Sequence, residues 1–244
     1  MSECTVCPYR VKGPLRKLSH VAFDHLNPSF RTRRYETGEA VFLQGDAVSE
    51  FFFLCGGAVK LVRESPEGKQ TIVEVLGPCG WFGEFSFCDE AVHSLTAEAL
   101  EPVTAKSISQ RHMAEFLRKE PELLFEMVER LNVSLRESRA HNADYAHRPV
   151  RLRALNLLTS LFARYGRQVN GHWELGLPLA RAEIGEMLGV TTETTIRTLA
   201  QLQREGHLQL GRRRIYISDP QALRSLSRRE SLGPEGASFC SEEK

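Results

Sequence analysis

The sequence predicts an α+β protein in which an antiparallel β-roll, a long helix and a winged helix-turn-helix follow one another along the chain. Short apolar runs separated by glycines extend to about Ser109, and a heptad-like apolar repeat follows Pro121. Two short helical patterns then meet at Gly189 and lead into a basic hairpin. A chain of 244 residues is long enough for two compact domains of this kind.

Composition narrows the function classes before any motif is considered. Hydrophobic residues make up 41% of the chain and charged residues 26%, and no uncharged apolar stretch approaches the length of a membrane span. The N-terminal residues lack the basic and apolar regions of a secretory signal, and six cysteines are too few for a disulfide scaffold. We therefore expect a cytoplasmic protein with no membrane partner.

Residues 21–120 are expected to form the β-roll, after an N-terminal segment of residues 1–20 that carries a Cys-x-x-Cys motif. Turn-forming glycines recur about every ten residues, which is typical of an antiparallel sandwich or barrel of about eight strands. The expected strands include 40–43, 51–54, 58–62 and 71–76.

Residues 121–147 predict a long helix with a single apolar seam. Apolar and small polar side chains recur at alternating steps of four and three, as in a coiled coil, and require a partner helix. The simplest partner is the same helix of a second copy; packing on the chain's own β-roll is the alternative. The expected interface residues are Leu124, Val128, Leu131, Leu135 and Asn142, of which Asn142 would fix the register.

Pro149 ends this helix and marks a hinge before the domain expected at 148–220. Residues 148–229 carry 14 Arg and 6 acidic residues, whereas residues 1–147 have a net charge of −4. Because the Arg guanidinium suits phosphate and guanine, this block is a candidate for binding double-stranded DNA. The Ser- and Gly-containing tail at 221–244 is expected to be disordered.

Residues 179–206 predict a helix-turn-helix with Gly189 at the turn. The apolar residues expected to be buried between its helices are Leu179, Ile184, Leu188, Val190, Ile196 and Leu199. The outward face of the second helix would present Thr192, Glu193 and Arg197 to base edges in a major groove. An ion pair between Glu193 and Arg197 within the helix is the alternative.

Two alternating runs at 208–217 surround a basic turn and predict a wing beside the helix-turn-helix. Arg212, Arg213 and Arg214 at its tip are expected to contact DNA phosphates, which adds affinity but little sequence information.

The order of these elements resembles the CRP/FNR family of transcription regulators, named for the cyclic-AMP receptor protein and the fumarate-nitrate regulator. The resemblance covers roughly residues 20–220 and rests on these motifs: Thr37-Gly-Glu, Gly57-Ala-Val-Lys, Gly80-Trp-Phe-Gly-Glu, the heptad helix, Arg181-Ala-Glu-Ile-Gly and Thr192-Glu-Thr with Arg197. It implies a cyclic-nucleotide-binding-like jelly roll and a homodimer whose recognition helices contact a palindrome, with RNA polymerase as a further partner. It also implies phosphate contacts from Arg181, Thr191 and Thr194, whereas Thr192 replaces the Arg of the cyclic-AMP branch.

The same resemblance also allows the expected effector site to be compared with that of the family's cyclic-nucleotide binders. The expected effector pocket contains Gly83, Glu84, Ser94 and Leu95. Cyclic-nucleotide binders of the family hold the phosphate with an Arg followed by Ser or Thr, where this chain has Ser94 and Leu95. No Arg or Lys occurs between Gly83 and Ala105, so we expect that cyclic AMP is not the effector.

An iron–sulfur or thiol redox sensor is an alternative within the family. Cys4 and Cys7 precede the β-roll, and Cys79 or Cys88 would have to complete a ligand set, because Lys106 stands where the family's last ligand would be. A zinc half-site, a redox dithiol or chance spacing would explain the same motif.

Two further function classes remain at this point. One is a regulatory module that acts through protein partners, against which the Arg-rich C-terminal block argues. The other is a thiol oxidoreductase, but the sequence has no phosphate-binding loop, acid pair or nucleophile–base spacing. We therefore expect no enzymatic activity.

Overall fold

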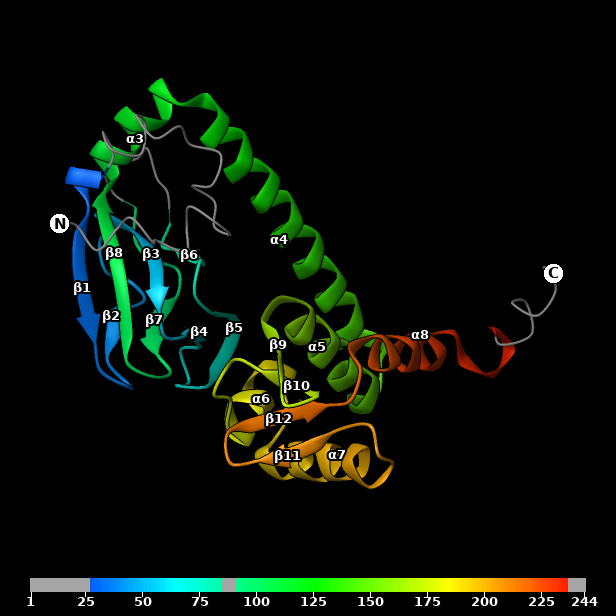
Figure 1. Ribbon diagram of the computed structural model, residues 1–244. Coiled ribbons are helices and arrows are strands. Elements are labelled where there is room, and N and C mark those ends of the chain that lie inside the picture. The colour runs from blue at the N-terminus through cyan, green and yellow to red at the C-terminus, as the bar shows by residue number, and fades with distance from the viewer. Residues whose placement is uncertain (1–26, 85–90, 237–244) are drawn as a thin grey trace. The chain divides into compact units, whose positions relative to one another are not determined.

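The computed structural model describes residues 27–84 and 91–236 (Figure 1). The chain divides into two compact units, residues 1–139 and 140–244, and each is described by itself.

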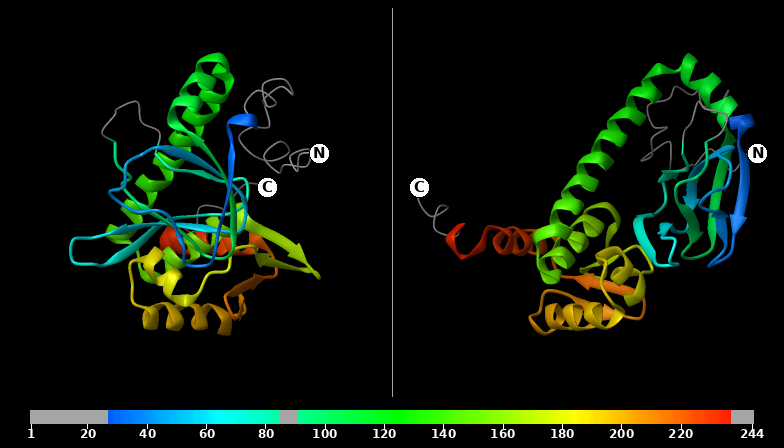
Figure 2. Two further views of the ribbon diagram at one scale, coloured as in Figure 1. Left: turned by 90° about the vertical axis from the view of Figure 1, so that its left-hand side faces the viewer. Right: turned by 180° about the vertical axis from the view of Figure 1, so that it is seen from behind.

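The first unit is the predicted β-roll. Its strands form two four-stranded antiparallel sheets with the orders β1-β8-β3-β6 and β2-β7-β4-β5, seen from two further sides in Figure 2. The strands are β1 (Arg31–Tyr35), β2 (Ala40–Phe42), β3 (Glu50–Gly56), β4 (Val59–Glu64), β5 (Gln70–Leu76), β6 (Trp81–Phe82), β7 (Thr96–Ala99) and β8 (Val103–Ser109). The strands expected from the apolar runs are thus confirmed as β2 to β5.

The core of the roll follows from the alternation of its strands. In β3, which is buried almost throughout, Phe52 and Leu54 pack in one apolar cluster, while Phe51 and Phe53 pack in another. The cluster of Phe51 and Phe53 continues into helix α3 (Gln110–Lys119). The Ser109 side chain caps the first turn of this helix. A short 3-10 helix, η3 (Asn27–Ser29), precedes β1.

Helix α4 (Pro121–His147) has the predicted bounds and two kinds of apolar side chain. Leu123 and Met127 are buried in the β-roll cluster. The apolar side chains left exposed, by 42–73%, include Leu124, Phe125, Val128, Leu131 and Leu135. Four predicted interface residues therefore lie at the surface of this chain, and the side chain of Asn142 lies outside the described part.

The second unit is the predicted winged helix-turn-helix. Its elements are α5 (Val150–Tyr165), β9 (Gly166–Val169), β10 (His172–Leu175), α6 (Arg181–Leu188), α7 (Thr192–Arg204), β11 (Gln209–Gly211), β12 (Arg214–Ile217) and α8 (Pro220–Gly236). The strands form one antiparallel sheet in the order β11-β12-β10-β9. The Asn170-Gly171 turn joins β9 to β10 with positive φ at both residues, as the hairpin signal predicts.

The expected disorder from residue 221 is wrong for 221–236, which form most of helix α8 (red in Figure 2). The Asp219 carboxylate accepts hydrogen bonds from the backbone N–H groups of Gln221 and Ala222, and Pro220 occupies the first helical position. Leu223 and Ser227 are buried, and α8 packs against α5. Capping and one buried face outweigh the polar composition that suggested disorder.

Within the described ranges, no helix is both long and apolar enough to cross a bilayer.

Candidate DNA interface and effector cavity

Helices α6 and α7 meet in a tight turn that depends on two glycines. Gly189 ends α6 in the left-handed conformation, with φ of 62°, as the sequence predicts. A Cβ at Gly185 would lie 2.9 Å from Thr195 Oγ1 and 3.0 Å from the Val190 carbonyl oxygen. Only glycine allows this close approach, which sets the position of α7.

The start of α7 is built by threonines with different tasks. Thr191 is the N-cap, and its hydroxyl accepts a hydrogen bond from the Thr194 N–H at 3.3 Å. Thr195 and Thr198 are buried and donate their hydroxyls to backbone carbonyls one turn earlier. Because Thr195 and Thr198 face the core, the opposite face of α7, which carries Thr192, is exposed to solvent.

Glu193 and Arg197 lie on this exposed face. Within the described part of the chain, neither side chain makes a hydrogen bond or an ion pair, so the alternative of an intrahelical pair between them is not formed. Glu193 also lies in the first turn of α7, where a carboxylate is favourable. Both side chains retain their full hydrogen-bonding capacity for an external partner.

The expected burial of Ile196 is wrong. Its side chain is 51% exposed, because helical spacing places it one turn after Thr192 and beside Arg197. The exposure of Ile196 follows from the sequence once Thr192, Glu193 and Arg197 are assigned to the exposed face, because Ile196 lies four residues after Thr192. An apolar side chain among polar ones suits the methyl group of thymine in a major groove.

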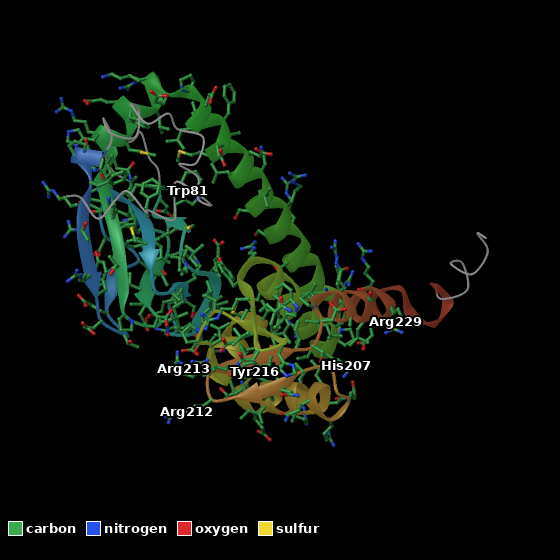
Figure 3. The ribbon with its side chains drawn as sticks, in the orientation of Figure 1. Trp81, His207, Arg212, Arg213, Tyr216 and Arg229 are labelled. Atoms are coloured by element: carbon green, nitrogen blue, oxygen red, sulfur yellow. The ribbon has the colours of Figure 1, made fainter. Side chains whose placement is uncertain are left out.

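The three arginines of the wing have different surroundings; Arg212 and Arg213 are labelled in Figure 3. Arg212 is exposed and makes no hydrogen bond or ion pair to a described residue. Arg213, with φ of 54°, donates to the Pro178 carbonyl at 2.9 Å and pairs with Glu183 at 3.2 Å. Arg214 pairs with the buried Glu174. Two of the three predicted phosphate contacts thus also hold the wing to its own domain.

Arg181, at the start of α6, is half-buried and donates to the Gly211 carbonyl at 3.1 Å. Burial lowers the pKa of its guanidinium from the ordinary value, yet an arginine stays charged in proteins. The contact joins α6 to strand β11, so Arg181 links the helix-turn-helix to the wing.

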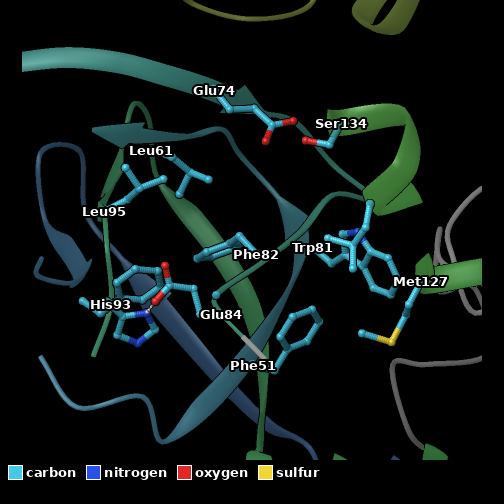
Figure 4. A pocket seen from close by; sticks show the side chains of 13 residues that line it. Phe51, Leu61, Glu74, Trp81, Phe82, Glu84, His93, Leu95, Met127 and Ser134 are labelled. Atoms are coloured by element: carbon cyan, nitrogen blue, oxygen red, sulfur yellow. Dashed lines mark ion pairs between the residues drawn. The ribbon is translucent and has the colours of Figure 1, made fainter. Parts of the chain in front are cut away.

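The β-roll contains a cavity of about 400 Å³ between its strands and α4 (Figure 4). Its lining is mainly aromatic and aliphatic. The lining residues are Phe42, Phe51, Leu61, Glu74, Trp81, Phe82, Gly83, Glu84, His93, Leu95, Met127, Leu131 and Ser134. This volume lies within the range of small-molecule sites.

Three of the four predicted effector-pocket residues, Gly83, Glu84 and Leu95, line this cavity. Ser94 does not line the cavity but positions Glu84, since its backbone N–H donates to both carboxylate oxygens of Glu84 at 3.0 Å. The Ser94 carbonyl accepts a hydrogen bond from Arg63 at 3.2 Å, and Arg63 does not line the cavity. Three of the four predicted residues therefore lie around one cavity, and Ser94 holds the Glu84 side chain from outside its lining.

His93 is a residue of this site that the sequence analysis did not identify as part of the pocket. It is 3% exposed, its ring stacks on Phe42 with centroids 3.7 Å apart, and its Nδ1 lies 3.9 Å from Glu84 Oε2. Burial lowers the pKa of His93, although Glu84 and Asp46 act in the opposite direction. The imidazole is therefore held mainly neutral, and only the folded chain could reveal its contact with Phe42.

Of the predicted metal ligands, Cys4, Cys7 and Cys88 lie outside the described residues. Cys79 is half-buried and packs against the cluster of Phe51. Among the residues that the structure describes, no group of three or more His, Cys, Asp or Glu side chains is arranged to hold a metal ion. Lys106 donates to the Asn27 side chain at 3.1 Å. A cluster held by Cys4 and Cys7, with Cys79 or Cys88 completing the set, therefore stays a prediction.

An antiparallel β-roll with a cavity, joined to a winged helix-turn-helix whose second helix exposes polar side chains without a described partner, is the architecture of a DNA-binding regulator. Residues 32–120 match the cyclic nucleotide-binding domain family, and residues 153–226 match the Crp-like helix-turn-helix domain family. The chain belongs to the CRP/FNR family of transcription regulators. It is a sequence-specific DNA-binding transcription regulator, and regulators of this family act as dimers.

Individual relatives agree with this assignment. The chain is 26% identical over 189 residues to the CRP-like cAMP-activated global transcriptional regulator of Mycobacterium tuberculosis, covering 78% of this chain and 84% of that protein. It is 25% identical over 226 residues to the nitrogen fixation regulation protein FixK of Bradyrhizobium diazoefficiens, covering 93% of each. The fold is similar to FixK2 from Bradyrhizobium japonicum, with a TM-score of 0.72 at 23% identity over 81% of this chain and 96% of that one.

Proposed function

We propose that the protein is a homodimer that binds a palindromic site in double-stranded DNA through α7 and responds to an effector in the β-roll cavity. The observation that carries this proposal is the exposed face of α7, where Glu193 and Arg197 have no partner among the described residues. An unpaired carboxylate and guanidinium next to each other suit the cytosine amino group and the guanine O6 and N7 atoms. We place this activity in the cytoplasm, with RNA polymerase as a partner.

The residues divide into three roles at the DNA. Thr192, Glu193, Ile196 and Arg197 contact base edges, with Ile196 against a thymine methyl group. Thr191, Thr194, Arg181 and Arg212 contact phosphates. Arg213 and Arg214 position the wing, and each retains a guanidinium edge for a phosphate.

The homodimer rests on the exposed apolar side chains of α4. Leu124, Val128, Leu131 and Leu135 follow the four-three spacing of a coiled-coil seam and are 42–67% exposed in the single chain. A second copy of the same helix covers such a stripe with an identical one, which a twofold axis requires. Two recognition helices related by that axis fit two inverted half-sites.

The experiment that tests this proposal is selection of bound fragments from random double-stranded DNA, followed by fluorescence anisotropy on the selected sequence and on a scrambled one. We expect an inverted repeat whose affinity for the protein exceeds that of the scrambled DNA by about a thousandfold or more. Binding that shows no preference, or that prefers an unrepeated site, would contradict the proposal.

A further inference from the structure

We propose that the β-roll cavity binds a small planar aromatic molecule that is uncharged or cationic and carries an N–H donor. This inference rests on the proposed function of the cavity as the effector site, and it names the chemical class of the effector.

The aromatic lining indicates the shape of the ligand. Phe51, Trp81 and Phe82 are at least nine-tenths buried and line the cavity together with Phe42. Phe52 and Phe82 stack at 5.2 Å, so the Phe82 ring is braced from the core. Flat rings held in this way favour a flat guest, which makes offset or edge contacts with them.

The charges of the lining indicate the sign of the ligand. Glu74 and Glu84 line the cavity, and none of its described lining residues is Lys or Arg. In Figure 4 these two carboxylates lie on opposite sides of the Phe82 ring. An anion placed here would lose its water without gaining a cationic partner among the described lining residues, whereas a cation would meet the Glu84 carboxylate and several aromatic faces.

The polar atoms next to Glu84 indicate the functional group. The Ser94 N–H occupies part of the hydrogen-bonding capacity of the Glu84 carboxylate, and each oxygen can accept another donor. His93 Nδ1 is buried without a hydrogen bond and lies 3.9 Å from that carboxylate. A ligand N–H directed at Glu84, with an adjacent ring nitrogen or oxygen at His93, would satisfy both groups.

The position of the cavity connects such a ligand to α4. Met127, Leu131 and Ser134 of this helix line the cavity, and Leu131 also belongs to the exposed apolar seam with 67% of its side chain accessible. A bound ring would therefore contact the same helix that carries the proposed dimer interface.

Methionine methyl NMR on the full chain tests the inference, because Met127 is the only one of the three described methionines that lines the cavity. The probes are indole, tryptamine and indole-3-acetate, which share a ring and N–H but are neutral, cationic and anionic. The Met127 signal is assigned by Met127→Leu, and Met187 in α6 is the internal control. We expect indole and tryptamine to shift the Met127 signal and leave the Met187 signal unchanged, with indole-3-acetate weaker than tryptamine by about tenfold or more.

A charge-removing pair of variants identifies the group responsible. Glu84→Gln keeps the shape and should reduce the preference for tryptamine over indole-3-acetate by about tenfold. Glu67→Gln removes the same charge from the exposed turn between β4 and β5, outside the cavity, and should leave the preference unchanged.

Three results would overturn the inference: no shift of Met127 with millimolar indole or tryptamine, tighter binding of indole-3-acetate, or an unchanged preference in Glu84→Gln. DNA anisotropy on the same samples separates this failure from that of the proposed function. Sequence-specific DNA binding without ring binding would reject only the ligand class, whereas ring binding without DNA binding would reject only the regulator.

Discussion

The exposed face of α7 and the cavity of the β-roll are both functional surfaces, but they are built in different ways. The first comes from four residues within two turns of one helix, Thr192, Glu193, Ile196 and Arg197, and its charged members are unpaired within the described chain. The second is assembled from strands and α4, over residues that range from Phe42 to Ser134. The α7 face carries Glu193 and Arg197, which match the family's motif by resemblance, whereas the described lining of the cavity includes no Lys or Arg that could hold a phosphate. On our proposal, α7 recognises DNA as in the family, whereas the cavity takes an effector other than a cyclic nucleotide.

The largest effect is expected from breaking the dimer, on which the α7 face depends and the cavity does not. Val128→Glu combined with Leu135→Glu places charges in the proposed seam, at side chains that are 47% and 48% exposed and outside the cavity lining. We expect monomers in sedimentation velocity and a loss of affinity for the inverted repeat of about a hundredfold or more, because the two half-sites no longer bind together. Val133→Glu, on the other face of α4, is the matched control, and a dimeric double variant would contradict the proposed interface.

Removal of one base-contacting side chain should have the next largest effect. Arg197→Ala should cost about 1–3 kcal/mol at the selected site and relax the preference at one guanine per half-site. Arg204→Ala, in the last turn of the same helix, should change the affinity little. Anisotropy on a panel of single-base variants measures both effects. A loss shared equally by every sequence would assign Arg197 to the phosphate backbone instead.

Ile196 offers a smaller and more specific test of the same face. If its side chain contacts a thymine methyl group, replacing that thymine by uracil should cost the wild type about 1 kcal/mol. The same replacement should cost Ile196→Ala almost nothing, since the contact is already lost. Equal costs in the two proteins, measured at each thymine of the half-site, would show that Ile196 contacts no methyl group.

The wing arginines should separate phosphate binding from local packing. Arg212→Ala should weaken selected and scrambled DNA alike and reduce the salt slope by about one per contact. Arg213→Ala removes the bonds to Pro178 and Glu183, so we expect it also to lower the thermal stability of the protein. Thermal unfolding that is the same for both variants would contradict a packing role for Arg213.

The smallest effect is expected from cyclic nucleotides. Cyclic AMP and cyclic GMP should leave DNA affinity within about twofold of its starting value, because a buried phosphate would meet Glu84 and no lining cation. Titration calorimetry on the same preparation checks for silent binding. Micromolar binding of either nucleotide would contradict the comparison, and Arg63→Gln would then test whether the guanidinium bonded to Ser94 provides the missing cation.

Local signals allowed the sequence by itself to determine the order of the elements, the tight turn at Gly189 and the exposed pair Glu193 and Arg197 on α7. Each depends on neighbours within one or two turns of the chain, and periodicity and capping preferences act over that range. The same reasoning failed at two places. For Ile196, periodicity did not decide which face of α7 is buried. For α8, the polar composition concealed the buried face of the helix.

The tertiary structure alone decided which residues surround the cavity and which charges are already paired. Phe42 and His93 are distant in sequence but stack at 3.7 Å, and beyond the paired strands β2 and β7 the Gly45 N–H donates to the His93 carbonyl at 2.8 Å. Arg212 and Arg213 are adjacent residues of the same type, yet only Arg213 forms a hydrogen bond with Pro178 and an ion pair with Glu183. Burial and pairing arise from contacts between distant segments, and no pattern along the chain contains them.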